Sequence, residues 1–141
     1  MVVLGPGLGR NQSMLGRISI IMEKAKQRDI PVVVDADGLW HLATNPGLLQ
    51  VRGYHYDLKL PSYFYYPCAQ GYTKAVITPN AMEFTRLVKA VLHKDVSPCV
   101  SPDPRLVEDL AQRMGNITIM HKGCPDLISN GKVNIILEIE I

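Results

Sequence analysis

Hydrophobic residues in the first third of the chain recur at spacings that predict alternating strands and helices. Residues 1–4 form a short apolar run, and apolar positions three or four residues apart follow it. These positions are Leu15, Ile18, Met22 and Ala25. The stripe predicts an amphipathic helix over residues 12–28. Residues 30–34 are apolar throughout, which is typical of a strand in a parallel sheet covered on both faces. A short helix is expected over residues 39–44.

The second half of the chain repeats this alternation. Residues 75–77 predict a strand, and a helical stripe of apolar residues follows it. The stripe consists of Phe84, Leu87, Val88 and Val91. Asp103 and Pro104 are residue types favoured at a helix cap and at the first helical position, so another helix is expected to begin there. Gly115 is expected to end that helix.

The last predicted elements are a strand over residues 117–120 and a hairpin that turns at Asn130-Gly131. Strands that alternate with helices predict an α/β fold, with a mainly parallel sheet flanked by helices. A strand pattern begins at residue 2, and residues 133–141 still alternate, whereas compact domains rarely start and stop inside strands. We therefore expect residues 1–141 to form a single partial domain, a piece of a larger fold.

Residues 51–70 interrupt the alternation. They hold five of the six tyrosines and two prolines, and their apolar positions follow neither a helical nor a strand period. We interpret this segment as an insertion or an irregular loop. Its aromatic side chains could stack on nucleic-acid bases, but without a basic surface beside them an adhesive loop is the favoured interpretation.

Composition narrows the classes of function. The chain has 141 residues and a net charge of only +2, which argues against a nucleic-acid surface. No apolar run reaches the length of a membrane span, so no membrane partner is expected. The three cysteines, Cys68, Cys99 and Cys124, are far apart and lack the spacing of a zinc site. Free thiols in a reducing compartment are the simplest interpretation.

The segment with the clearest chemical character is Gly-Pro-Gly-Leu-Gly-Arg at residues 5–10, here named the glycine loop. Glycines between a strand and a helix let bare backbone approach a ligand, and the helix start favours an anion such as phosphate. The spacing matches neither the dinucleotide fingerprint nor the phosphate loop. A glycine-rich turn without a ligand therefore remains an alternative.

Polar residues follow four predicted strands. The four clusters are the glycine loop and residues 35–38, 78–86 and 122–126. In open parallel α/β sheets, ligands bind at the carboxyl ends of the strands. We therefore expect these clusters to converge on one crevice.

Each cluster also has an interpretation without a ligand. Asn80 and Glu83 have the spacing of a capping box, and ligand contact and helix capping can hold together. Asp35-Ala36-Asp37-Gly38 could be only a turn or a helix cap, and Lys122-Gly123 a turn with a solvated lysine. Arg86 is a surface residue unless the crevice reaches it. The four histidines, His41, His55, His93 and His121, show no triad spacing, so ordinary packed or solvent-facing rings are expected.

Taken in order, four segments resemble those of the ATP- or ADP-dependent NAD(P)H-hydrate dehydratases, repair enzymes with a ribokinase-like fold. They are Val-Leu-Gly-Pro-Gly-Leu-Gly-Arg (3–10), Pro-Val-Val-Val-Asp-Ala-Asp-Gly-Leu-Trp (31–40), Thr-Pro-Asn-Ala-Met-Glu-Phe (78–84) and His-Lys-Gly-Cys-Pro-Asp-Leu-Ile-Ser-Asn-Gly (121–131). The resemblance covers nearly the whole chain except residues 51–70. It implies dehydration of the S form of hydrated NADH or NADPH. In that family the ring hydroxyl is thought to be phosphorylated and phosphate then eliminated.

The resemblance also implies binding residues. Gly7 would contact the hydrated dinucleotide, together with the start of the following helix: Asn80, Ala81, Met82, Glu83, Phe84, Thr85 and Arg86. A second set would hold ATP (or ADP): Lys122, Gly123, Cys124, Pro125 and Asp126. Mg²⁺ is expected to accompany the nucleotide, although the residues themselves show no metal cluster. The implied compartment is the cytoplasm or the mitochondrion, and the sequence says nothing of oligomeric state.

Three departures from the family pattern bear on activity. The family's catalytic Gly-Gly-x-Gly-Asp segment and its first strands do not occur in these residues. Pro125 also removes an amide that could meet phosphate. We therefore assign no catalytic residue and expect this chain to be inactive by itself. The alternatives are a truncated isoform that only binds nucleotide, and another ribokinase-like small-molecule kinase.

Overall fold

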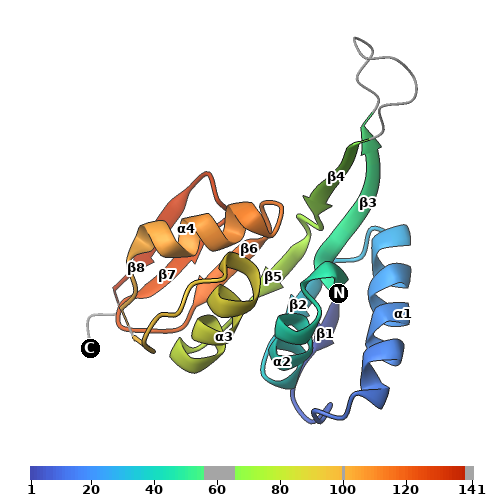
Figure 1. Cartoon of the computed structure of the whole chain (residues 1–141), viewed down its shortest axis with the longest axis horizontal. Helices are drawn as coiled ribbons and strands as arrows, with labels where there is room; N and C mark the ends of the chain where they lie inside the picture. Colours follow the sequence, from blue (N-terminus) through green and yellow to red (C-terminus); the bar gives the residue numbers. More distant parts are fainter. Residues whose placement is uncertain (56–65, 100, 139–141) are drawn as a thin grey trace.

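The main body of the protein is a six-stranded mixed sheet (Figure 1). The computed structural model describes residues 1–55, 66–99 and 101–138, with backbone alone for residues 51–55 and 66–70. The strands lie in the order β1-β2-β5-β6-β7-β8. Their bounds are β1 (Val2–Leu4), β2 (Val32–Val34), β5 (Ala75–Ile77), β6 (Thr118–His121), β7 (Asp126–Ser129) and β8 (Asn134–Leu137). The first four strands run parallel and the last two pair antiparallel. The predicted α/β class with a mainly parallel sheet is confirmed.

The helices lie where the hydrophobic stripes predicted them. They are α1 (Ser13–Gln27), α2 (Asp37–Thr44), α3 (Ala81–Leu92) and α4 (Pro104–Arg113), with a 3-10 turn η1 at Pro46–Leu49. Asp103 caps α4 as expected, since its Oδ1 accepts a hydrogen bond from the Arg105 amide at 2.9 Å. Gly115 follows that helix with φ +82°, which a side chain would strain. Within the described residues, every helix is too short or too polar to cross a membrane.

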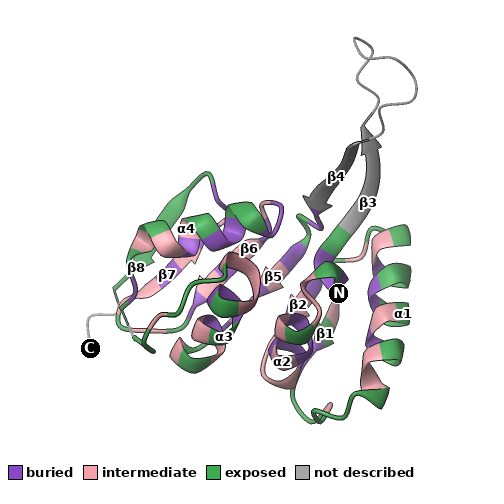
Figure 2. Ribbon diagram, in the orientation of Figure 1, coloured by how far each residue is buried: buried purple, intermediate pink, exposed green. Residues whose placement is uncertain are grey.

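The core lies between one face of the sheet and the helices (Figure 2). Parallel strands that step in one direction across a sheet, joined by right-handed crossovers, carry their helices on the same face. The strand positions that face the helices are buried: Leu4, Val32, Val34, Ala75, Ile77 and Ile119. On the opposite face Val33 is half-buried and Val3 is 57% exposed. The expected cover on both faces is therefore present on one face only in the described part of the chain.

Residues 50–55 and 66–71 correct one expectation. They form β3 (Gln50–His55) and β4 (Tyr66–Gly71), an antiparallel pair outside the main sheet. The described residues of segment 51–70 are thus paired strands, where the sequence predicted no regular element. Backbone pairing between the two strands supplies the order, because it does not require alternating hydrophobic residues. Residues 56–65 lie outside the described residues, and the interpretation of the segment as an insertion stays a prediction.

The β7–β8 hairpin turns as predicted at Asn130-Gly131. Gly131 has φ +78°, and the Asn130 carboxamide oxygen accepts hydrogen bonds from the amides of Lys132 and Val133. Every residue of β8 is exposed, because this strand forms one edge of the sheet and no described helix covers it.

Candidate functional site

The four polar clusters gather at one edge of the sheet. Strands β1, β2, β5 and β6 are parallel, so their carboxyl ends share that edge, and one cluster follows each strand. Hydrogen bonds join the clusters across long stretches of sequence, for example between Gly9 and Asp37 and between Lys122 and Asp35. The predicted convergence at one edge is confirmed, whereas a crevice between the clusters stays a prediction.

Two glycines bring the loops after β1 and β2 into direct backbone contact. A Cβ atom on Gly5 would lie 2.2 Å from the Asp35 carbonyl oxygen, and one on Gly38 would lie 2.5 Å from the Leu4 carbonyl oxygen. The Asp35 amide also donates to the Leu4 carbonyl at 2.9 Å. The two loops therefore approach more closely than side chains would allow.

The exposed part of the glycine loop is open to solvent. Gly7 and Gly9 have φ values of +78° and +70°, and a Cβ atom on either would meet nothing within 4 Å. These two glycines are needed for backbone conformation and not for tight packing. Their accessible backbone fits the predicted role of Gly7 in ligand contact.

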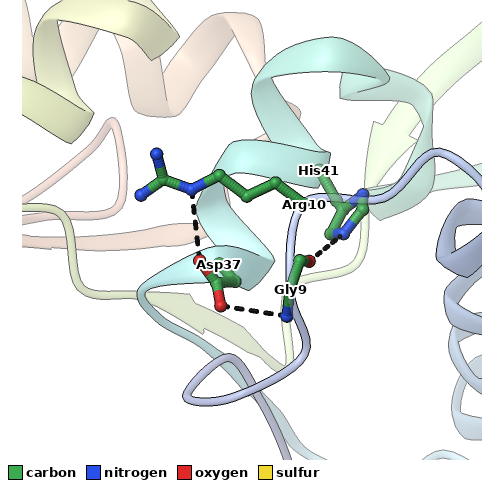
Figure 3. Close-up of polar contacts among 4 residues, drawn as sticks. All are labelled: Gly9, Arg10, Asp37 and His41. Carbon is green, nitrogen blue, oxygen red and sulfur yellow. Dashed lines mark hydrogen bonds and ion pairs between the residues drawn. The ribbon is translucent and has the colours of Figure 1, made fainter.

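Asp37 connects the glycine loop to the start of α2 (Figure 3). Its Oδ2 accepts a hydrogen bond from the Gly9 amide at 3.0 Å, and its Oδ1 accepts one from Arg10 Nε at 3.2 Å. One turn further along α2, His41 Nε2 lies 2.8 Å from the Gly9 carbonyl oxygen. Because a carbonyl oxygen only accepts, Nε2 carries the proton. Both ends of the Gly9 residue are thus fixed by α2.

Lys122 and Asp35 form an ion pair across the same edge. Lys122 Nζ lies 2.9 Å from Asp35 Oδ1, and the two side chains are 43% and 32% exposed. Burial acts to raise the pKa of Asp35, but hydrogen bonds from Lys122, the Ala36 amide and Thr78 outweigh it and lower that pKa below its ordinary value. Asp35 is therefore a carboxylate at neutral pH, and Lys122 is a partly exposed cation beside it.

The loop after β6 is shaped by its own acid. The Gly123 amide donates to Asp126 Oδ1 at 2.8 Å, so that amide points at the protein's own carboxylate. The Lys122 amide donates to the Pro79 carbonyl at 2.8 Å, which ties this loop to the one after β5. Cys124 is an exposed free thiol. Of the residues predicted to hold nucleotide, Lys122 and Cys124 are the ones open to solvent.

The start of α3 is a complete capping box. Asn80 Oδ1 accepts from the Glu83 amide at 3.0 Å, and Glu83 Oε2 accepts from the Asn80 amide at 2.9 Å. The capping interpretation of these two residues is confirmed, and both side chains are already engaged. Thr85 donates to the carbonyl of Ala81 at 2.9 Å.

The other α3 residues differ in their accessibility. Met82 is 51% exposed, and Arg86 is also exposed, so both side chains are open to solvent. Whether Arg86 reaches a ligand at this edge stays a prediction. Phe84 is buried and packs edge-on against the His121 ring, with 4.9 Å between ring centroids. Any role of Phe84 in binding would therefore be indirect, through its packing against His121.

Two buried histidines lie behind the site. Packed rings were among the expected outcomes, but nothing in the sequence analysis placed His41 against the glycine loop. A signal was present, because Asp37 and His41 are four residues apart and therefore share one face of α2. Among the described residues, neither ring nitrogen of His121 has a hydrogen-bond partner, and burial lowers the pKa of this ring below its ordinary value.

The molecule also has a cavity away from this edge of the sheet. It has a volume of about 640 Å³ and lies between α1 and η1. Its lining consists of Ser19, Glu23, Lys26, Gln27, Asn45, Gly47, Leu48 and Gln50. No predicted ligand-binding residue belongs to this set. Lys26 donates there to the Leu48 and Gln50 carbonyls at 2.5 and 2.6 Å, which anchors the end of α1.

The described residues show no ready-made cluster of ligands for the predicted Mg²⁺. Within the part of the chain that the structure describes, no three His, Cys, Asp or Glu side chains are grouped to hold a metal ion. The edge instead offers cations and accessible backbone, which suit an anionic ligand.

Comparison with known proteins adds an independent line of evidence. Residues 1–139 match the family described as NAD(P)H-hydrate dehydratase. A Pongo abelii protein named ATP-dependent (S)-NAD(P)H-hydrate dehydratase is 44% identical over 93% of this chain and 33% of its own length. Proteins of the same name from Homo sapiens and Sorghum bicolor are 42% and 37% identical over 93% of the chain, and 31% and 29% of their own lengths. The chain spans about a third of the length of the curated relatives it matches.

Proposed function

Because the chain belongs to the NAD(P)H-hydrate dehydratase family, we propose that residues 1–141 carry the nucleotide-binding edge of an ATP-dependent (S)-NAD(P)H-hydrate dehydratase. The fold is that of a partial ribokinase-like domain, an α/β unit with a mixed sheet of six strands. The observation that carries the proposal is the Lys122–Asp35 pair, which joins the loop after β6 to the loop after β2. It places the predicted ATP lysine at the same sheet edge as the glycine loop.

The first ligand is hydrated NADH or NADPH. We assign its pyrophosphate to the glycine loop, where Gly7 leaves backbone accessible. The start of α3 would line the same ligand through Met82 and Arg86, whose side chains are exposed. Asn80 and Glu83 shape that helix start through their capping box and keep its first turn in place.

The second ligand is ATP. The ammonium group of Lys122 is a compact point charge, which suits the oxygens of a nucleotide phosphate. Asp126 would fix the shape of the loop by accepting a hydrogen bond from the Gly123 amide. Mg²⁺ would arrive with the ATP phosphates and keep most of its water ligands, as it does in many nucleotide sites.

The overall reaction would return the hydrated nicotinamide ring to NADH or NADPH at the expense of ATP. Residues 1–141 contain no Gly-x-Gly-Asp segment to supply a base and an anion hole. We therefore expect these residues to bind both nucleotides without turning the hydrate over. The exposed thiols Cys99 and Cys124 favour a reducing compartment, the cytoplasm or the mitochondrion.

Titration of residues 1–141 with ATP, followed by calorimetry or amide NMR shifts, tests the proposal. Lys122→Ala is expected to weaken ATP binding about tenfold or more, because a hydrogen bond to a charged group contributes roughly 1.5–3 kcal/mol. Lys132→Ala, an exposed lysine in the β7–β8 turn, is the matched control and should bind ATP like the wild type. Equal ATP affinities for the two variants would refute the assignment. Conversion of hydrated NADH by residues 1–141 alone would refute the expected lack of turnover.

A further inference from the structure

We infer that Arg10 binds the pyrophosphate of the dinucleotide, and that Asp37 and His41 hold Arg10 and the preceding glycine in the position this requires. The inference rests on the proposed function, since it takes a dinucleotide as the ligand of the glycine loop. The resemblance to the family assigned no role to any of these three residues. Their arrangement in Figure 3 carries the argument.

At Gly9 the conformation of the glycine loop is held by contacts with α2. Gly9 has no side chain and a φ of +70°, so it has little intrinsic preference for the observed shape. Asp37 accepts its amide at 3.0 Å and His41 donates to its carbonyl at 2.8 Å. Two hydrogen bonds from adjacent turns of one helix fix both polar groups of Gly9. The backbone immediately before Arg10 therefore has a defined direction.

The second oxygen of Asp37 then orients the guanidinium of Arg10. Oδ1 accepts a hydrogen bond from Nε at 3.2 Å, and the two terminal nitrogens point away from Asp37 (Figure 3). Within the described residues, neither terminal nitrogen has a protein hydrogen-bond partner. The Arg10 side chain is 56% exposed, so a ligand can reach it. A guanidinium anchored at Nε with both terminal groups open has the planar fork that binds two oxygens of a phosphate group.

Stability alone does not account for this arrangement. An exposed ion pair contributes only about 0–1 kcal/mol, because solvent screens the charges and ordering the side chains costs entropy. The pair instead restricts a flexible arginine next to an accessible glycine backbone. Restricting a side chain before binding reduces the entropy lost on binding. Lys122 adds a second cation at the same edge, on the far side of the β2 loop.

The test measures the affinity of residues 1–141 for NADH, NADPH and inorganic pyrophosphate by calorimetry or amide NMR shifts. Arg10→Ala is expected to weaken all three about tenfold or more, and Arg10→Lys to restore part of the loss. Arg28→Ala, an exposed arginine just after α1, is the matched control and should leave the affinities unchanged. Because Arg10 is exposed, thermal midpoints of the Arg10 and Arg28 variants should agree with that of the wild type.

Asp37→Asn separates positioning from simple charge. Removal of a negative charge next to the loop would tighten anion binding if electrostatics alone mattered. The positioning role predicts weaker binding of NADH, since one of the two Asp37 contacts is lost. Tighter or unchanged binding by this variant would overturn the role of Asp37.

The remaining outcomes distinguish a failure of this inference from a failure of the proposed function. If Arg10→Ala binds NADH like the wild type while Lys122→Ala loses ATP, the inference about Arg10 is wrong and the proposed function stands. A loss confined to NADPH would overturn the assignment to pyrophosphate, because NADH lacks the additional 2′-phosphate. Wild-type residues 1–141 that bind none of these compounds would refute the proposed function and the inference together.

Discussion

Gly38→Ala and Gly16→Ala are the same chemical change at two helical positions, yet they should shift stability in opposite directions. Gly16 lies within α1, and a Cβ atom there meets nothing within 4 Å. Gly38 is the second residue of α2, where an added Cβ would lie 2.5 Å from the Leu4 carbonyl oxygen and 2.9 Å from Val34 Cγ1. A gain in helix propensity is therefore expected at both sites, whereas the space for a Cβ atom differs between them.

The magnitudes follow from these two terms. Alanine in place of glycine in a helix interior stabilises by roughly 0.8–1 kcal/mol, which is the full expectation at Gly16. At Gly38 the carbonyl of Leu4 cannot move away, because it already accepts the Asp35 amide at 2.9 Å. Forcing a methyl group into a packed site costs about 1–3 kcal/mol and more where backbone must shift. We expect Gly38→Ala to lose about 1–2 kcal/mol net of the helix gain.

Urea unfolding monitored by circular dichroism measures both variants against the wild type. In a parallel thermal unfolding experiment, each kcal/mol of stability would correspond to a shift of the midpoint by roughly 3–4 °C for a domain of this size. A Gly38→Ala variant as stable as the wild type would show that the loops after β1 and β2 do not depend on their close backbone contact. A Gly16→Ala variant that loses stability would show that α1 is limited by something other than helix propensity.

Three further predictions concern individual side chains. Asn80→Ala should destabilise by about 1 kcal/mol through loss of the α3 cap, and an unchanged urea midpoint would contradict this. Burial lowers the pKa of His121 in the folded protein below 6.5, so the unfolded chain is protonated first as the pH falls. The stability that the neutral buried ring contributes is therefore complete above about pH 6.5 and is lost as the pH falls further. His121→Leu should therefore show a shallower loss of unfolding free energy than the wild type between about pH 7 and 5, and parallel curves would refute the assignment. Lys122→Ala should raise the pKa of Asp35, measured by carboxyl NMR titration, while stability changes by less than about 1 kcal/mol because the pair is partly exposed.

Local patterns were sufficient for most of the framework. The stripe over residues 15–25 and the capping spacing of Asn80 and Glu83 depend on residues three or four positions apart, which interact directly within a helix. The convergence of the four loops followed from topology alone, since parallel strands present their carboxyl ends at one edge. These inferences did not require knowledge of any specific tertiary contact.

Contacts between residues far apart in the sequence could not be predicted from local patterns. Lys122 and Asp35 are 87 positions apart, and Gly9 and Asp37 are 28 apart, so no local pattern pairs them. The burial of Phe84 against His121 likewise depends on how α3 packs over β6. The pairing of β3 with β4 was not predicted, because cross-strand backbone hydrogen bonds form with almost any side chains, including strands without alternating hydrophobic residues.

If Lys122 holds ATP as we propose, its contact with Asp35 makes nucleotide capture a competition. An incoming phosphate competes with a carboxylate that the ammonium already holds, so singly charged anions such as chloride or acetate would gain little from binding there. Multiply charged oxyanions would interact with the ammonium more strongly than the Asp35 carboxylate does. The displaced Asp35 carboxylate would then have a pKa closer to its ordinary value and would stay within reach of the Thr78 hydroxyl. It could pair with Lys122 again when the nucleotide leaves.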